Sequence, residues 1–306
     1  MAESAASPSP SRAPAFAALI AVMAMWGSNA AVAKLIMPAF GAIPMTWLRW
    51  VMVMLLAAPF AWRERAAVRE VLRTHLRSLF LLTLVGGAPQ TIIVFYGLDF
   101  STAVHLGLLN SVIPVLILLL GAALFGHHLV GRELTGVLIS AAGVLVIVFE
   151  GSFAALLTLA INRGDAIMLV GMLLWALYTL KLNHRPQGIS LMSFMFVMAA
   201  IGVPLTAPLM LREVLVHGWP QAGMRDVALL FYMSAIPTLL STLLYGHAIA
   251  RVGPAQAGVF LHAVPLFSCL FAALIAGEHL YPYHALGLVL VAGGAWLSTQ
   301  KKPVPG

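Results

Sequence analysis

The chain consists of long apolar stretches separated by short breaks that contain glycine, proline or charged residues. A helix that crosses a hydrocarbon core of about 30 Å needs about 20 predominantly apolar residues. Ten stretches meet this requirement, and each predicts one membrane-spanning helix. Their approximate bounds are 15–37, 44–62, 78–98, 101–125, 131–149, 166–182, 189–211, 226–250, 254–276 and 280–298. The pattern therefore predicts an all-α polytopic membrane protein with ten transmembrane helices.

Glycines and prolines recur at a fixed offset of 151 residues within these stretches. The first set is Gly107, Pro114, Gly126, Gly136 and Gly143, and the second is Gly258, Pro265, Gly277, Gly287 and Gly294. A duplicated hydrophobic unit is typical of secondary transporters. Because each unit holds five spans, an odd number, the second unit enters the membrane from the opposite side. The sequence thus predicts two inverted five-helix repeats.

The predicted organisation has five parts, two of them repeats. They are a disordered cytoplasmic tail (1–14), repeat 1 (15–149), an inter-repeat linker (150–163), repeat 2 (164–299) and a cytoplasmic tail (300–306). The first tail consists mainly of small and polar residues and is rich in proline, a composition typical of disordered segments. The middle of the linker remains apolar, so packing of this segment at the membrane surface is expected.

Lysine and arginine are distributed unequally between the two sides of this topology. With the N-terminus inside, twelve of them lie in inner segments and three, Arg163, Arg212 and Arg225, in outer segments. Cytoplasmic segments carry the excess of positive charge in membrane proteins. Both termini are therefore predicted to be cytoplasmic.

Composition excludes an ordinary soluble domain. The chain is 61% hydrophobic and 9% charged, whereas soluble domains carry about 25% charged residues. The formal net charge of +7 follows from the positive-inside distribution, so no nucleic-acid partner is expected. The single cysteine, Cys269, permits no intrachain disulfide.

Several segments resemble the EamA family of the drug/metabolite transporter (DMT) superfamily. They are WGSNAAVAKL in span 1, the beginning of span 2 from Pro44 to Arg49, the blocks around Pro114 and Pro265, and PAQAGVFLHAVPLFSCLFAALIAGEHLYPYHALGLVLVAGGAWL. The resemblance covers about 15–149 and 164–299. It implies ten helices in two repeats and transport of small metabolites, often export (efflux) of amino acids or related compounds. The chain departs from the family pattern at Gly126-His127-His128 and at His262.

Spans 4 and 9 carry the main candidates for substrate binding. Gly107, Ser111 and Pro114 share one face of span 4, and Gly258, His262 and Pro265 share the equivalent face of span 9. Ser111 lies about 15 Å from the outer end of its helix and His262 about 12 Å from the inner end, which places both near the midplane. Each proline locally opens its helix and is predicted to act as a hinge. The alternative is that both polar side chains bond only to helix backbone or to a neighbouring helix.

Aromatic and polar side chains at related positions form a second group of candidates. Tyr96 and His247 are 151 residues apart, and both side chains are expected to point toward the protein interior and not toward lipid. The alternative for His247 is a position near the inner membrane interface. Two further pairs lie on the first helix of each repeat, Trp26 with Asn29 and Trp175 with Tyr178. Such faces suit a cavity for amphipathic molecules; packing between helices is the alternative.

Two cations fall within spans, where a charge is costly. Lys34 lies about one turn from the outer end of span 1 and is expected to extend toward the outer surface. Arg49 lies about 8 Å inside span 2. It either attracts a carboxylate substrate or bonds to carbonyls and to Asp99 or Glu150 as a structural staple. No acidic residue is assigned to a span, which disfavours obligatory proton coupling.

The remaining motifs predict no catalytic chemistry. Six glycines are predicted to allow close helix packing: Gly107, Gly258, Gly136, Gly143, Gly287 and Gly294. Phosphate-loop, zinc-helix and Ser/His/Asp motifs are not found, so no catalytic residues, metal or cofactor are predicted and the chain is not expected to be an enzyme.

The sequence therefore predicts an alternating-access transporter in a bacterial cytoplasmic (inner) membrane, with a small-molecule substrate and the lipid bilayer as its partners. A homodimer is left open. The alternatives are a membrane scaffold or sensor without transport, and an intramembrane enzyme that uses His262 with Ser111.

Overall fold

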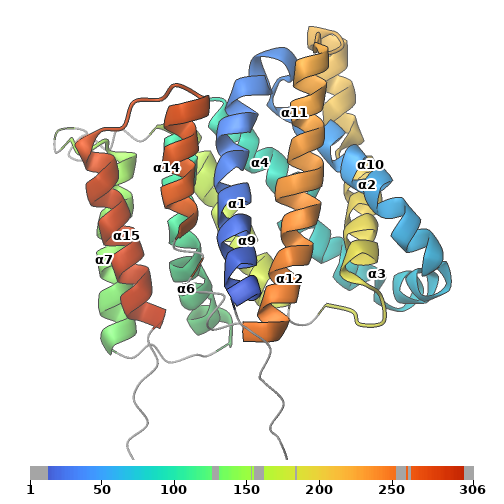
Figure 1. Cartoon of the computed structure of the whole chain (residues 1–306), viewed down its shortest axis with the longest axis horizontal. Helices are drawn as coiled ribbons and strands as arrows, with labels where there is room; N and C mark the ends of the chain where they lie inside the picture. Colours follow the sequence, from blue (N-terminus) through green and yellow to red (C-terminus); the bar gives the residue numbers. More distant parts are fainter. Residues whose placement is uncertain are drawn as a thin grey trace, which may run out of the picture.

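The structure is a computed structural model, and it describes residues 13–125, 131–152, 154, 162–182, 185–252, 260 and 263–299. The regular elements of this described part are all helical (Figure 1). Six helices in it are long and apolar enough to cross a membrane, and shorter apolar helices accompany them. The prediction of an all-helical membrane protein is confirmed, whereas the arrangement as ten spans in two repeats stays a prediction.

The helices follow the apolar stretches of the sequence. In chain order they are α1 (Ala13–Phe40), α2 (Ala42–Arg63), α3 (Arg65–Gly86), α4 (Ala88–Leu98), α5 (Ala103–Leu109), the 3₁₀ turn η1 (Asn110–Val112), α6 (Ile113–Phe125), α7 (Gly131–Val148), α9 (Arg163–Leu182), α10 (Leu191–His217), α11 (Met224–Ser234), the π-helical η2 (Ala235–Leu240), α12 (Ser241–Val252), α14 (Val264–Ile275) and α15 (Pro282–Thr299). The beginning of α1 and the end of α15 lie at the same edge of the molecule (Figure 1).

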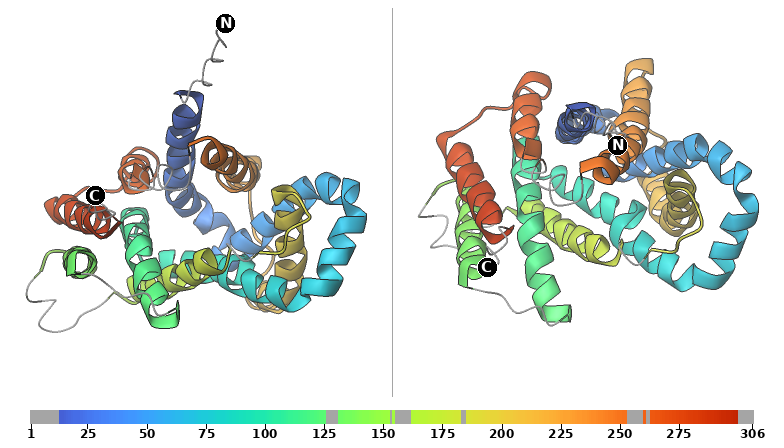
Figure 2. Two further views of the ribbon diagram at one scale, coloured as in Figure 1. Left: turned by 90° about the horizontal axis from the view of Figure 1, so that it is seen from below. Right: turned by 60° about the horizontal axis from the view of Figure 1, so that its bottom comes forward.

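Helices far apart in the sequence pack side by side. The most extensive pairs are α7 with α15, α2 with α10, α1 with α14 and α12, and α9 with α4 and α6 (Figure 2). In the two predicted repeats, α1 corresponds to α9, α6 to α14 and α4 to α12. When each helix is replaced by its counterpart, the pair α1–α14 becomes α9–α6 and the pair α1–α12 becomes α9–α4, so the set of packed pairs is unchanged. The pairs α2–α10 and α7–α15 map onto themselves.

Small residues bring α7 and α15 into close contact. A Cβ atom at Gly143 would lie 2.7 Å from a methyl carbon of Val291, and one at Gly294 would lie 2.5 Å from the carbonyl oxygen of Gly136. The Ser140 hydroxyl donates to the carbonyl oxygen of Val291 at 3.0 Å. Close backbone approach of this kind increases van der Waals contact where no hydrophobic effect drives helices together.

Residues 65–77, which lie between the second and third predicted spans, are helical in the structure. They form the first half of α3, in which His75 has non-helical backbone angles (φ −128°, ψ 20°) and marks a kink. The third predicted span is divided at Gly87, which is extended between α3 and α4. Residues 1–12 and 300–306 of the tails, the pair His127-His128 and most of the linker lie outside the described residues.

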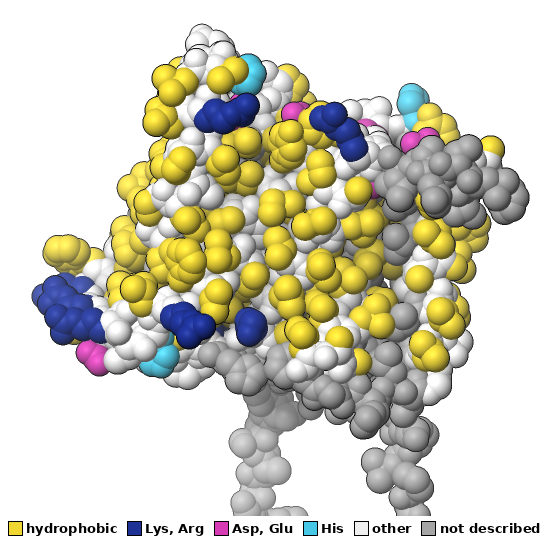
Figure 3. Space-filling view, turned by 180° about the vertical axis from the view of Figure 1, so that it is seen from behind, with side chains coloured by type: hydrophobic (Ala, Val, Ile, Leu, Met, Phe, Trp, Pro, Cys, Tyr) yellow, Lys and Arg dark blue, Asp and Glu magenta, His cyan; other side chains and the backbone are white. Residues whose placement is uncertain are grey.

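The surface has the distribution of side chains that a bilayer requires. On the face drawn in Figure 3, hydrophobic side chains cover the middle, and Lys and Arg lie toward the upper and lower edges. Lipid-facing surface is apolar, and charged residues extend toward the interfaces. The described surface is therefore consistent with a chain that crosses the membrane several times.

Candidate functional site

A buried arginine lies where α2 meets the π-helical turn η2. The Nε and Nη2 atoms of Arg49 donate to the Thr238 hydroxyl oxygen at 3.2 and 2.6 Å, and the residue is only 6% exposed. Its guanidinium carbon lies 5.6 Å from the centre of the Phe95 ring. Within the described part of the chain, the Nη1 atom has no hydrogen-bond partner.

The backbone of η2 explains why Thr238 is available to Arg49. Pro237 has no N–H to donate to the carbonyl of Met233 four residues earlier, and the Thr238 hydroxyl donates to that carbonyl instead, at 2.8 Å. The oxygen of this hydroxyl can then accept from the guanidinium. Thr238 lies halfway along the helical run from Met224 to Val252. Single π-helical turns within α-helices occur often at functional sites.

Polar and aromatic side chains of α1 continue the same cluster. The Trp26 Nε1 atom donates to the Ser241 hydroxyl at 2.9 Å, and the Trp26 and Tyr245 rings are 5.1 Å apart between centres. The Ser28 and Tyr232 hydroxyls share a hydrogen bond of 2.8 Å. We call the group formed by Trp26, Ser28, Arg49, Tyr232, Thr238, Ser241 and Tyr245 the central cluster.

Two unpartnered buried atoms of opposite character lie on α1 and α2, the helices that contribute Trp26 and Arg49 to the central cluster. Arg49 Nη1 is a charged donor, and Asn29 Oδ1 is an acceptor that also has no partner among the described residues. A buried polar atom without a partner costs about 1–3 kcal/mol, and more when it is charged, so native proteins rarely retain one without a reason. A guanidinium matches a carboxylate in charge and geometry. Arg49 therefore has the chemistry to receive a carboxylate, and Asn29 has the chemistry to receive a hydrogen-bond donor.

A second polar cluster lies where α5 and α9 begin. His105 Nδ1 lies 2.9 Å from an oxygen of Asp165, and the Ser101 hydroxyl donates to the other oxygen of this carboxylate. All three side chains are buried. We call this group, together with Glu278 and His284, the outer cluster, because the predicted topology places it at the outer end of the molecule.

Glu278 joins the segment between α14 and α15 to the beginning of α5. Its two carboxylate oxygens accept from the backbone N–H groups of Ala103 and Val104, each at 2.8 Å. The first N–H groups of a helix lack intrahelical partners and favour negative charge. Glu278 therefore links the C-terminal half of the chain to the N-terminal half, as Asp165 does through His105.

A cavity of about 300 Å³ adjoins these residues, with His284 in its wall. The ring centres of His284 and His105 are 5.5 Å apart. His284 Nδ1 accepts from the backbone N–H of Tyr281 at 3.1 Å, and its Nε2 has no partner among the described residues.

The two cations within predicted spans both bond inside the protein. Arg49 contacts Thr238, and neither Asp99 nor Glu150 is its partner. Lys34 donates from Nζ to the carbonyl oxygens of Leu98 and Ser101 at 2.9 and 2.7 Å. Lys34 therefore extends toward the predicted outer end of the molecule, where Ser101 lies, and bonds there to backbone carbonyls.

Three predicted binding residues are exposed in this structure. Tyr96 is 41% exposed and Trp175 is 37% exposed, and His247 is also exposed near the end of α12. The inward direction expected for Tyr96 and His247 stays a prediction. Tyr178 is buried against α10, where its hydroxyl lies 3.9 Å from the Met198 sulfur.

The candidate pair on spans 4 and 9 stays a prediction. His262 and Gly258 lie outside the described residues, and only the backbone of Ser111 is described, within η1. The 3₁₀ turn η1 ends at Val112, two residues before Pro114, and α14 begins one residue before Pro265. Each predicted hinge thus lies at a change in helical structure.

Several residues of both clusters were not found from the sequence. Asp165 was assigned to the break before span 6, whereas the structure places it fully buried in the first turn of α9. Thr238, Tyr232 and Glu278 were missed because their partners are more than 170 residues away. The proline of η2 was the one local signal for Thr238.

Comparison with known proteins identifies similar chains. The family described as EamA-like transporter family matches residues 13–149 and 162–300. An uncharacterized transporter of Bacillus subtilis (strain 168) is 22% identical, over 95% of this chain and 88% of the relative. A "Probable terminal-alkyne amino-acid exporter" of Streptantibioticus cattleyicolor is 23% identical, over 93% of each chain.

Two further similarities concern an efflux protein and a fold. A "Probable amino-acid metabolite efflux pump" of Escherichia coli (strain K12) is 24% identical, over 90% of this chain and 92% of the relative. One solved crystal structure has a TM-score of 0.55 at 19% identity, and the match covers 94% of this chain and 98% of that one. This last similarity supports the fold alone.

Proposed function

This chain belongs to the EamA-like transporter family, and on that premise we propose that it is a secondary transporter that exports small amphipathic metabolites bearing a carboxylate, such as amino acids. One relative named as a probable amino-acid exporter and one named as a probable amino-acid metabolite efflux pump support this substrate class. The proposed location is a bacterial cytoplasmic membrane, with both termini in the cytoplasm.

The observation that carries this proposal is the unpartnered Nη1 atom of buried Arg49. Thr238 fixes one side of the guanidinium through two hydrogen bonds, which leaves the other side free to donate to a carboxylate. The carboxylate would neutralise a charge that is costly within the membrane. Asn29 Oδ1 would accept from the ammonium group of an amino acid, and Trp26 and Tyr245 would contact its apolar part.

Alternating access would follow from movement of the two halves relative to each other. Two observations support it: helix pairs are preserved on exchange of the two halves, and the bonds of the outer cluster join one half to the other. Breaking the contacts of Asp165 and Glu278 would open the central cluster outward. Pro114 and Pro265 would let the helices that bear Ser111 and His262 bend.

The remaining predicted residues would provide further contacts with the substrate. Ser111 and His262 would complete the substrate site from spans 4 and 9. Trp175 and Tyr178 would correspond in the second half to Trp26 and Asn29, and exposed Tyr96 and His247 would contact substrate only in another conformation.

Counterflow in proteoliposomes tests this function. Vesicles that contain the purified chain are loaded with a mixed pool of metabolites, and exchange is followed by mass spectrometry at equal and unequal pH. We expect selective exchange of carboxylate-bearing metabolites. If correctly inserted protein exchanged no solute, the scaffold or sensor alternative would be favoured; release of a chemically altered solute would favour an enzyme.

A further inference from the structure

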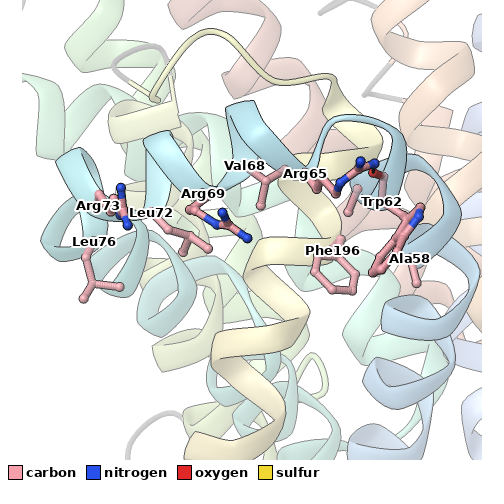
Figure 4. A pocket seen from close by; sticks show the side chains of 10 residues that line it. Ala58, Trp62, Arg65, Val68, Arg69, Leu72, Arg73, Leu76 and Phe196 are labelled. Atoms are coloured by element: carbon pink, nitrogen blue, oxygen red, sulfur yellow. Dashed lines mark hydrogen bonds between the residues drawn. The ribbon is translucent and has the colours of Figure 1, made fainter.

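A groove lies between α2, α3 and α10, at the edge of the molecule that also carries the beginning of α1 and the end of α15 (Figure 1, Figure 4). Its volume is about 570 Å³, within the range of small-molecule sites. Its lining is apolar except for three arginines. The apolar lining residues are Ala58, Ala61, Trp62, Val68, Leu72, Leu76 and Phe196.

The three arginines follow one face of the first half of α3. Arg65, Arg69 and Arg73 are spaced by four residues and lie along the groove (Figure 4). Like charges at this spacing destabilise a helix. Among the described residues, no carboxylate lies within ion-pairing distance of any of the three. An anion bound along this face would relieve the repulsion.

The acidic residues nearest in sequence do not supply that anion. The Glu64 carboxylate accepts from the backbone N–H of Ser190 at 2.9 Å, and Glu70 does not line the groove. The Arg65 guanidinium instead lies over the Trp62 ring, 5.6 Å from its centre. The groove therefore presents net positive charge beside an apolar floor.

We propose that this groove binds one anionic phospholipid, with the phosphate among Arg65, Arg69 and Arg73 and an acyl chain along Leu72, Leu76 and Phe196. The charge of the groove is complementary to an anionic headgroup, and its apolar lining is complementary to a hydrocarbon chain. Trp62 is a side chain typical of the level where headgroups lie. This site is separate from the central cluster and is independent of the transported substrate.

Native mass spectrometry of the full-length protein tests the proposal, with phosphatidylglycerol as the anionic probe and phosphatidylcholine of the same acyl chains for comparison. Each basic residue near a membrane surface contributes about fivefold to anionic-lipid affinity. The triple variant Arg65→Gln/Arg69→Gln/Arg73→Gln is therefore expected to bind phosphatidylglycerol roughly 100-fold more weakly. Wild-type protein is expected to bind phosphatidylcholine much more weakly than phosphatidylglycerol.

A matched variant separates a built site from general attraction of anionic lipid. Arg63→Gln/Arg77→Gln/Arg251→Gln removes the same charge from exposed arginines that do not line the groove, and we expect it to retain lipid. Ala58→Phe fills the groove without changing charge and should lose lipid even if the arginine triple variant does not fold. Equal losses in the two triple variants, equal binding of both lipids, or undiminished binding by Ala58→Phe would overturn the proposal. Glycerol phosphate should not displace the lipid; displacement would indicate a site for free phosphate.

Discussion

Replacement of Arg49 by methionine separates a substrate site from a structural staple. Methionine matches the arginine side chain only as far as the Nε position, and it removes the charge and all five donors of the guanidinium. The Thr238 hydroxyl keeps its own bond to the Met233 carbonyl, so the change leaves no buried donor unsatisfied there. Replacing a buried charge by an apolar side chain is often neutral or stabilising. We therefore expect Arg49→Met to leave the free energy of unfolding unchanged or raise it.

The same replacement should strongly reduce substrate affinity. A hydrogen bond to a charged group contributes about 1.5–3 kcal/mol, so losing the bond from Nη1 predicts about 10- to 150-fold weaker binding. The affinity of the exchanged metabolite is measured by counterflow, and stability by thermal unfolding in detergent without substrate. The control Thr238→Val keeps the guanidinium but removes its described acceptor, and it should lower stability by about 1–3 kcal/mol.

The staple hypothesis predicts the opposite pair of results. If Arg49→Met lowered the unfolding temperature while transport affinity stayed at the wild-type value, the guanidinium would serve the fold and the reasoning from its unpartnered atom would be refuted.

Three further predictions concern packing, the outer cluster and pH. Gly294→Ala should destabilise the α7–α15 contact by about 1–3 kcal/mol through overpacking, whereas Gly293→Ala, whose Cβ would meet open space, should be neutral or stabilising; equal unfolding temperatures would contradict this. Glu278→Ala removes the carboxylate that caps α5, an interaction worth about 0.5–2 kcal/mol. Because this interaction is proposed to hold the outer side closed, membrane-impermeant reagents should label a cysteine in η2 from outside about 2- to 30-fold faster. An unchanged labelling rate would contradict the proposal that Glu278 holds the outer side closed. Hydrogen bonds from the Ser193 side chain, and then from the N-terminus of α10, lower the pKa of Glu64 below its usual 4.5. The stability it contributes is thus present above pH 4.5 and lost as pH falls through the lowered pKa. Glu64→Gln should flatten that acid dependence of the unfolding temperature, and an unaltered slope would refute the assignment.

The positions of the helices could be predicted from the sequence because the bilayer imposes length and hydrophobicity on each of them. The stretches 15–37 and 44–62 correspond to α1 and α2 within a few residues. Breaks inside helical regions were less predictable. Gly87 divides one apolar stretch, while the charged segment around Arg69 continues as helix because its residues suit an amphipathic surface helix.

The candidate site could be predicted only in part. Arg49 and Trp26 were recognisable because a charged or hydrogen-bonding side chain within an apolar stretch requires a partner. Their partners, Thr238 and Ser241, are ordinary in sequence and become specific only when helices pack. Asp165 was missed for the same reason, since its burial depends on α5 lying against α9.

Access to the central cluster from both sides of the membrane is the claim on which this account depends. The most direct test places one cysteine there, Thr238→Cys, in a chain whose native cysteine is removed by Cys269→Ser. Right-side-out and inside-out vesicles are then labelled with a membrane-impermeant thiol reagent. We expect labelling in both orientations and protection by the exchanged metabolite in both. Labelling from one side alone at every substrate concentration, with no protection, would contradict alternating access around this site.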